Sequence, residues 1–320
     1  MPISPAINPA ARPRMLVCDL DGTLLNGQSL MTQPTLSALQ QAVEAGIEVV
    51  FATGRRHSYA CTVLDSAGFH HNTVLVSSNG AITRTMAGER MQRTSMPVAT
   101  ALLLCRHLMD YRESLIFTFE RTGPGSMAVQ DIDALHQRLP RWVDSNRHEI
   151  ACCLPLETAF DSGNEPIQAM ICGTVDEMKK ARIFLDSPEV LPLRQNISLH
   201  RTEYIHRDLS VLDLMPRGCS KGAAIARLAG ERGINAAEIA CIGDNMNDAD
   251  MLVFAGQPIV MKNAAAELLA MAESNGWTIT GSNDEDGAAH AILRMLNDSP
   301  RASERNFASF AIPAVDTAGS

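Results

Sequence analysis

The sequence predicts an α/β protein with a parallel-sheet core and an inserted α+β region. Short apolar runs alternate with helical stretches near both ends of the chain, whereas the middle of the chain lacks this alternation. Polar motifs stand where the apolar runs end. The length of 320 residues exceeds that of an ordinary domain of about 150 residues, so we expect two domains.

The first β-α-β block occupies the beginning of the chain. Met15–Cys18 is a short apolar run without alternation, as in a strand that is buried on both faces. Apolar residues recur at helical spacing within Pro34–Ala45, and Ile47–Phe51 is the next predicted strand. A helix at Tyr59–Ser66 and a strand at Thr73–Ser77 complete this block. Strands joined through helices in this way form a parallel sheet with right-handed crossovers.

A second β-α-β block appears late in the chain. Helix Lys221–Arg232 precedes strand Glu238–Ile242, and helix Asp248–Phe254 precedes strand Gln257–Val260. Between the blocks we predict a helix at Val98–Tyr111 and several short strands, which are Leu115–Glu120, Ile167–Cys172 and Ile197–His200. The predicted organisation is a discontinuous core (15–83 and 214–297), an inserted α+β domain (84–213) and flexible termini (1–14 and 298–320).

Charge and hydropathy exclude several classes of partner. The net charge is −9 and the pI is near 5.5, so the average field repels nucleic acid and anionic membranes. No stretch of eighteen apolar residues occurs, and the first fourteen residues lack the apolar segment of a secretion signal. The eight cysteines show no CxxC spacing and are expected to be reduced thiols. We therefore expect a cytoplasmic protein without a nucleic-acid or membrane partner.

The motif DLDGT (residues 19–23) stands where the first predicted strand gives way to a loop. Ligands of open parallel sheets gather at the carboxyl ends of the strands, so Asp19 and Asp21 face one crevice there. Two carboxylates in this position can bind one hard cation and serve different chemical roles. The alternative is an ordinary Asp-Gly turn.

A hydroxyl group and a cationic group also stand at the ends of predicted elements. Thr53 in ATGR ends the second strand, where its hydroxyl and a neighbouring glycine suit a phosphate oxygen. Lys221 begins a helix, so its side chain and the helix N-terminus converge on one anion. Taken singly, Thr53 is a weak signal because Thr-Gly is an ordinary strand exit, and a solvated lysine at a helix start is the better explanation of Lys221.

The motif GDNMND (residues 243–248) follows the strand of the second block. Asp244 and Asp248 are four residues apart, so at a strand-to-helix junction one can bind a metal while the other supports it. Helix capping is the alternative for Asp248. Together, the strand-end motifs supply acidic metal ligands, a hydroxyl donor and a lysine, which phosphoryl transfer requires. No Walker A loop is present.

At these residues the chain resembles the haloacid dehalogenase (HAD) superfamily of aspartate-nucleophile phosphotransferases. The resemblance covers about residues 15–296. The spacing of the motifs and the insertion in the middle of the chain resemble those of the Cof-type sugar-phosphatase branch, which has a type IIB cap. The motifs that carry it are DLDGTLL (19–25), Thr53 in ATGR, SSNGA (77–81), Lys221-Gly222, GDNMNDADML (243–252) and MKNA (261–264). The resemblance implies a Rossmann-like core with an inserted cap domain.

The resemblance also implies roles for individual residues. Asp19 would attack phosphorus to give an aspartyl-phosphate, and Asp21 would act as general acid and base. The remaining roles are Mg²⁺ binding by Asp19, the backbone carbonyl of Asp21 and Asp244; phosphoryl binding by Thr53, Lys221 and Asn247; and orientation of a ligand water or Lys221 by Asp248. Arg55 can contact substrate or cap, and Asn79 can order the site; a solvated basic turn and a common Asn-Gly turn are their alternatives.

The expected activity is Mg²⁺-dependent hydrolysis of small phosphorylated metabolites, sugar phosphates in particular. A phosphomutase with the same intermediate and a non-catalytic phosphometabolite-binding regulator are the two alternatives. A mutase would need a bisphosphate activator, and a regulator would be expected to lack Asp19, Asp21 or Asp244, all of which are present. The sequence determines neither the physiological substrate nor the oligomeric state.

Overall fold

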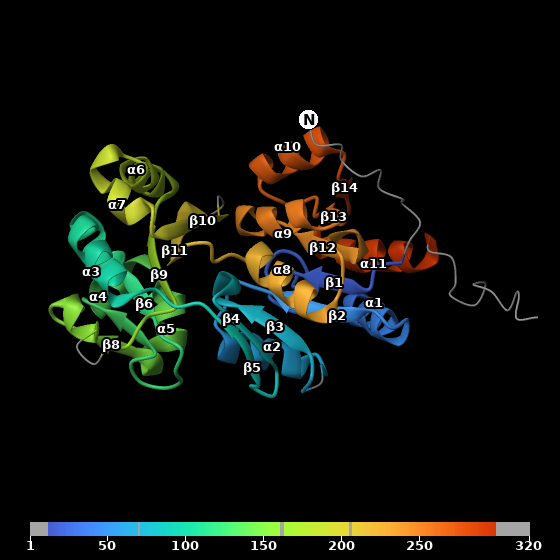
Figure 1. Cartoon of the computed structure of the whole chain (residues 1–320), viewed down its shortest axis with the longest axis horizontal. Helices are drawn as coiled ribbons and strands as arrows, with labels where there is room; N and C mark the ends of the chain where they lie inside the picture. Colours follow the sequence, from blue (N-terminus) through green and yellow to red (C-terminus); the bar gives the residue numbers. More distant parts are fainter. Residues whose placement is uncertain (1–11, 70, 161–162, 205–206, 299–320) are drawn as a thin grey trace, which may run out of the picture.

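The computed structural model describes residues 12–69, 71–160, 163–204 and 207–298. Two β-sheets dominate it, one on each side of the view in Figure 1. Nearly all of the two predicted flexible termini lies outside the described residues. Among the residues that are described, no helix is long and apolar enough to cross a membrane.

The first sheet has eight strands in the order β14-β13-β12-β1-β2-β3-β4-β5. All neighbours from β14 to β3 pair in parallel, whereas β4 and β5 extend the sheet in antiparallel fashion. Its strands are β1 (Met15–Cys18), β2 (Glu48–Ala52), β3 (Val74–Ser77), β4 (Ile82–Thr85), β5 (Arg90–Arg93), β12 (Ile239–Gly243), β13 (Gln257–Val260) and β14 (Thr278–Ile279).

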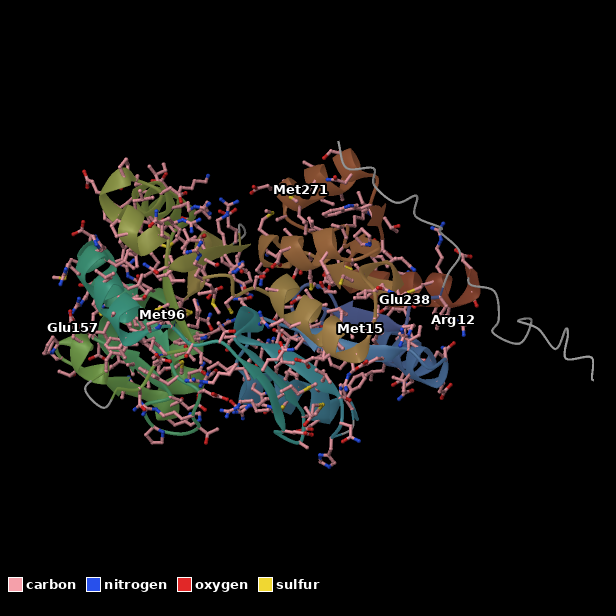
Figure 2. All side chains as sticks on the ribbon, in the orientation of Figure 1. Arg12, Met15, Met96, Glu157, Glu238 and Met271 are labelled. Atoms are coloured by element: carbon pink, nitrogen blue, oxygen red, sulfur yellow. The ribbon has the colours of Figure 1, made fainter. Side chains whose placement is uncertain are left out.

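Helices cover both faces of this sheet, as the continuous apolar strands predict. In β1, Leu16 and Cys18 pack against one helical layer, while Met15 and Val17 pack against the other. Met15 is labelled inside this half of the molecule in Figure 2. The first layer holds α1 (Gln33–Glu44), α2 (His57–Ser66) and α11 (Gly287–Asp298), and the second holds α8 (Lys221–Arg232), α9 (Ala249–Phe254) and α10 (Ala266–Asn275). The predicted α/β core is confirmed.

The second sheet has six strands in the order β10-β11-β9-β6-β7-β8, antiparallel except for the β7–β8 pair. Its strands are β6 (Ile116–Thr118), β7 (Met127–Val129), β8 (Ile150–Cys152), β9 (Gln168–Gly173), β10 (Ile197–Tyr204) and β11 (Leu209–Pro216). Its helices are α3 (Val98–His107), α4 (Ile132–Arg138), α5 (Pro140–Asn146), α6 (Val175–Leu185) and α7 (Leu191–Arg194). Helices and strands here surround separate apolar clusters, one of which contains Met96 (Figure 2).

Strand pairing extends each sheet past the residue at which the sequence analysis divided the domains. β5 belongs to the first sheet and ends at Arg93, beyond the predicted division at residue 84. β11 belongs to the second sheet and ends at Pro216, beyond residue 213. The chain then returns to the first sheet through the short segment that precedes α8, and this segment carries Lys221 to the site.

Candidate active site

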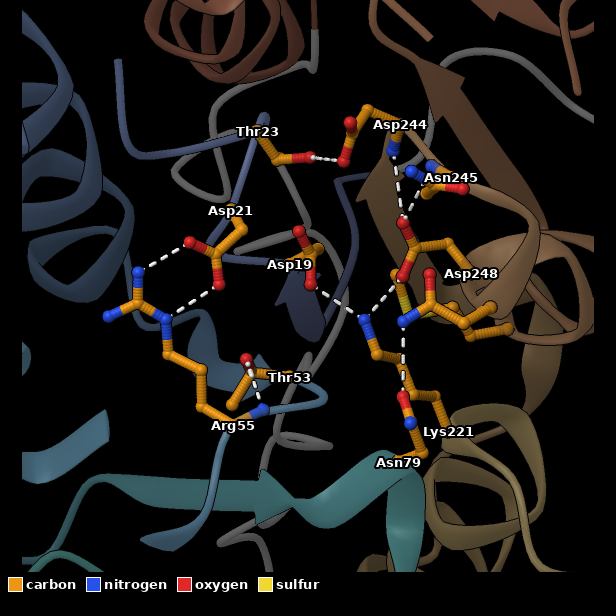
Figure 3. A network of polar contacts seen from close by, with 12 residues as sticks. Asp19, Asp21, Thr23, Thr53, Arg55, Asn79, Lys221, Asp244, Asn245 and Asp248 are labelled. Carbon is orange, nitrogen blue, oxygen red and sulfur yellow. Dashed lines mark hydrogen bonds and ion pairs between the residues drawn. The ribbon is translucent and has the colours of Figure 1, made fainter. Parts of the chain in front are cut away.

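Four separate chain segments meet at the carboxyl-terminal edge of the parallel strands (Figure 3). Asp19 directly follows β1, Thr53 follows β2 and Asp244 follows β12. Lys221 is the first residue of α8, whose N-cap Ser220 accepts a hydrogen bond from the backbone N–H of Ala223. Because neighbouring parallel strands end at one edge, the fold places these residues around one centre.

Lys221 connects two of the carboxylates. Its Nζ donates to Asp19 Oδ1 at 2.6 Å and to Asp248 Oδ1 at 2.5 Å, and its side chain is completely buried. The other oxygen of Asp248 accepts hydrogen bonds from the backbone N–H groups of Asp244 and Asn245, both at 3.0 Å. Asp248 therefore holds Lys221 with one oxygen and the β12 loop with the other.

Three carboxylates form the acidic cluster of the site. One oxygen from each of Asp19, Asp244 and Asp248 lies within 4.8 Å of the other two. Thr23 donates its hydroxyl hydrogen to Asp244 Oδ1 at 3.1 Å. Since both oxygens of Asp248 already accept hydrogen bonds, Asp19 and Asp244 are the carboxylates best suited to a cation.

The backbone of the DLDGT loop approaches Asp244 closely at Gly22. This glycine has φ +81°, and a Cβ atom there would lie 2.3 Å from Asp244 Oδ2. Only glycine fits this position, because a side chain would suffer both strain and overlap. Asn263 supports the same turn by donating to the Gly22 carbonyl at 2.8 Å.

Burial controls the ionisation of this cluster. It raises the pKa of Asp19 to about 7, against the opposing effect of Lys221, and raises the pKa of Asp244 well above its usual range. Burial alone would lower the pKa of Lys221, but the two carboxylates that it contacts raise it above its usual range. Lys221 is thus a fixed positive charge, and the carboxylates around it favour a further cation.

Asp21 has a different environment. Arg55 Nε donates to Asp21 Oδ2 at 2.6 Å, and a second guanidinium nitrogen contacts the other oxygen. The guanidinium also lies over the Tyr59 ring, 4.8 Å from its centroid. Thr53 Oγ1 accepts from the backbone N–H of Arg55 at 3.1 Å, which fixes the Thr53 hydroxyl beside this pair. Arg55 therefore contacts a site carboxylate in this structure.

The neighbouring Arg56, which has no predicted site role, contacts the inserted region instead. It donates to Ser126 Oγ at 3.2 Å and to Asn146 Oδ1 at 2.7 Å, and it forms an ion pair with Glu149. Consecutive arginines after β2 thus point to different parts of the molecule. The sequence ATGRRH contains no signal that distinguishes them.

Asn79 and Asn247 are brought together next to Lys221. Asn247 Nδ2 donates to Asn79 Oδ1 at 3.0 Å, and both side chains are buried. Asn79 lies in the 3₁₀ turn η1 (Ser78–Gly80) after β3, and Asn247 lies in η8 (Met246–Asp248) after β12. Figure 3 shows Asn79 below the Lys221 side chain. The structure thus brings every predicted site residue to one edge of the sheet.

Several supporting residues were not identified as site residues from the sequence. Thr23 and Asn263 belong to the motifs DLDGTLL and MKNA, so their place inside these motifs was a sequence signal for a role in the site. Asp213, described below, had one signal, which is a carboxylate inside the apolar run VLDLM. Gln168 had none, because a glutamine at the start of a strand is unremarkable.

Comparison with known proteins gives the family. The sequence profile of the haloacid dehalogenase-like hydrolases matches residues 16–292, so the chain belongs to that family. It is 28% identical over 305 residues to 5-amino-6-(5-phospho-D-ribitylamino)uracil phosphatase YwtE of Bacillus subtilis, covering 89% of this chain and 98% of that protein. A haloacid dehalogenase-like hydrolase from Bacteroides thetaiotaomicron shares the fold, with a TM-score of 0.67 and 25% identity over 88% of this chain and 99% of that one.

One curated relative is much longer than this chain. The chain is 29% identical over 292 residues to the chloroplastic endoribonuclease YBEY of Arabidopsis thaliana. The match covers 87% of this chain but only 46% of that protein. The chain thus spans less than half the length of that relative, whereas it spans nearly all of YwtE.

Proposed function

We propose that this hydrolase is a Mg²⁺-dependent phosphatase of small phosphorylated metabolites, sugar phosphates in particular, which forms an aspartyl-phosphate on Asp19. One observation carries the proposal: the buried Asp19 carboxylate is held by Lys221 beside Asp244, at the edge of the sheet where ligands bind. The similarity to YwtE, which is named as a phosphatase, supports the same reaction.

The donor set fits Mg²⁺. Mg²⁺ prefers oxygen ligands and binds through one or two carboxylates while it keeps several waters. Asp19 and Asp244 offer such oxygens, and the backbone carbonyl of Asp21 would be a third protein ligand. Burial, and after it the negative charges of Asp19 and Asp248, raise the pKa of Asp244, and a cation would compensate those charges. The ion would lower the repulsion between the nucleophile and an anionic phosphate.

Hydrolysis would proceed in two displacements. An oxygen of Asp19 bonds to phosphorus as the bond from phosphorus to the leaving oxygen breaks, and Asp21 gives its proton to that oxygen. A water oxygen would then bond to phosphorus while Asp21 takes a proton from it, and the bond between phosphorus and the Asp19 oxygen would break, which releases phosphate and restores the Asp19 carboxylate. Asp21 is suited to both steps because its side chain is 43% exposed and can reach the leaving group.

Three residues would hold the phosphoryl oxygens. Lys221 supplies a fixed positive charge, and Thr53 and Asn247 supply neutral hydrogen-bond donors. Asp248 would position Lys221, since one of its carboxylate oxygens accepts from Lys221 and the other accepts from the backbone N–H of Asp244. The proposed substrate class agrees with the name of YwtE, which describes a phosphate on a ribityl group.

The test is a phosphate-release screen over sugar, nucleotide, cofactor and amino-acid phosphates, with Mg²⁺ or with EDTA. We expect release only with Mg²⁺, and none from the Asp19→Asn variant. Release from a monophosphate without any bisphosphate activator would distinguish a phosphatase from a phosphomutase. Absence of release from every ester, or full activity in EDTA, would contradict the proposal.

A further inference from the structure

A buried chain of polar side chains joins the phosphoryl side of the site to the second sheet. Asn247 donates to Asn79 Oδ1 at 3.0 Å, and Asn79 Nδ2 donates to Asp213 Oδ2 at 2.9 Å. Gln168 Nε2 donates to the other oxygen of Asp213 at 2.5 Å. Asp213 lies on β11 and Gln168 on β9, so both belong to the second sheet.

All four side chains are less than 9% exposed. Asp213 is the only acidic residue in β11, and its neighbours Leu212 and Leu214 face the opposite side of the sheet, inside an apolar cluster. Burial raises the pKa of Asp213. A carboxylate in such a place is costly unless donors satisfy it, and the donors here are two side-chain amides.

The carboxylate determines how the amides are oriented. Ionised Asp213 only accepts hydrogen bonds, so Asn79 must turn its NH₂ group toward it. The Asn79 oxygen then faces Asn247, which must turn its own NH₂ group toward Asn79. Each amide NH₂ group has two hydrogens, so Asn247 keeps a second N–H for another acceptor.

The turn that carries Asn79 also touches other groups of the site. The Asn79 backbone N–H donates to the Thr53 carbonyl at 3.1 Å. At the next residue, Gly80, φ is +95° and a Cβ atom would lie 2.1 Å from the Ser220 carbonyl, directly before Lys221. The turn is therefore packed tightly between the end of β2 and the start of α8, which fixes the position of the Asn79 backbone.

We propose that Asp213 is a positioning residue for phosphoryl binding: from β11 it fixes the orientation of Asn79, and through Asn79 it aims the Asn247 amide at the phosphoryl oxygens. This inference rests on the proposed function. It makes the phosphoryl-binding amide dependent on the second sheet, because the carboxylate that orients it lies there. Asp213 itself touches no reacting atom.

The test is a double-mutant cycle between Asp213→Asn and Asn247→Ala. We measure kcat and KM for an ester that the wild-type protein hydrolyses, the inhibition constant of inorganic phosphate, and the midpoint of thermal unfolding. Asp213→Asn keeps the shape of the side chain but permits the amides to reverse. We expect it to weaken inhibition by phosphate about tenfold in the wild-type background and less than about twofold in the Asn247→Ala background.

Glu149→Gln is the matched control. Glu149 is also a buried acid of the inserted region, and it contacts Arg56 of the first-sheet side without touching Asn79 or Asn247. Its effect on phosphate inhibition should be the same in both backgrounds. If Asp213→Asn fails to fold, the double variant Asp213→Ala with Gln168→Leu replaces it in the cycle. It removes the orienting carboxylate together with the Gln168 amide that would otherwise lose its acceptor.

The outcomes separate this inference from the proposed function. A wild-type protein that hydrolyses no phosphate ester contradicts the proposed function itself. An active wild type in which Asp213→Asn leaves the phosphate inhibition constant unchanged overturns only the role of Asp213. Equal effects of Asp213→Asn with and without Asn247 overturn it as well, since a purely structural change would act independently of that amide.

Discussion

The two aspartates of the DLDGT motif lie two residues apart, yet their environments differ strongly. The Asp19 side chain is 6% exposed and is held by the fully buried Lys221, whereas the Asp21 side chain is 43% exposed and is paired with Arg55. β1 ends at Cys18, so Asp21 lies in the loop beyond the strand, where its side chain turns toward Arg55 while Asp19 turns toward Lys221. In the proposed reaction, the phosphoryl group would therefore lie in the buried surroundings of Asp19, and the leaving group would lie on the solvent-exposed side of Asp21.

The second sheet faces this open side. Its strand β10 approaches η8, and the ring of Tyr204 at the end of β10 lies in the field of Asp21 and Asp19. In the proposed reaction, the part of the substrate other than its phosphate would therefore face the second sheet.

Removing the buried carboxylate gives the largest expected effect. Asp19→Asn eliminates the nucleophile and one metal ligand, so we expect turnover to fall by at least about 10⁴-fold. Phosphate release under saturating Mg²⁺ measures this loss, and circular dichroism checks that the variant is folded. Activity within tenfold of the wild type would show that residue 19 is not the nucleophile.

Changing the open aspartate gives a smaller effect that depends on the leaving group. Asp21→Asn removes the general acid, and we expect kcat to fall about 10²- to 10³-fold for alkyl phosphates. The loss should be smaller for p-nitrophenyl phosphate, because nitrophenolate leaves without a proton. Equal losses for both esters would contradict the assignment of Asp21 as the acid.

The buried Asp19 carboxylate should also make Mg²⁺ binding depend on pH. Because the raised folded-state pKa of Asp19 is about 7, a proton competes with the cation below that pH. The apparent Mg²⁺ affinity should therefore weaken about tenfold for each pH unit between pH 7 and pH 5. Calorimetry in buffers of different ionisation enthalpy counts the released protons. An affinity that is constant over this range would argue against Asp19 as a ligand.

The exposed ion pair gives the smallest expected effect. Arg55→Lys keeps the positive charge but loses the two-pronged contact with Asp21, so kcat/KM should fall about three- to tenfold. The unfolding free energy should change by less than about 1 kcal/mol, because Asp21 is partly exposed to solvent. Steady-state kinetics and thermal denaturation measure the two quantities. A large loss of unfolding free energy would mean that the Arg55–Asp21 pair, like Asp19 and Lys221, is part of the buried framework of the site.

Regular elements were predicted best where burial dominates the sequence pattern. β1, β13 and α8 have the predicted bounds, since apolar runs and the Gly233 stop leave little choice. The hairpin of β4 and β5 was missed because edge strands such as RMQR are polar and exposed. The helix predicted to reach Tyr111 ends at His107 and continues as a 3₁₀ turn, a boundary that the periodicity does not mark.

The site followed a similar division. Asp19, Thr53, Lys221 and Asp244 were predicted from their places at strand ends and at a helix start, and the structure assembles them. The contact of Arg55 with Asp21, the reach of Arg56 to the inserted region and the joining of Asp213 to Asn79 were not predictable. In the last case, 134 residues separate the two partners in the chain.

The sequence by itself determined which chemical groups gather at the edge of the first sheet, because parallel strands bring their carboxyl ends together whatever lies between them. Only the tertiary structure decided which partner each side chain takes and how deeply it is buried. Those choices depend on distances between atoms that are remote along the chain, and a local pattern of residues does not contain them.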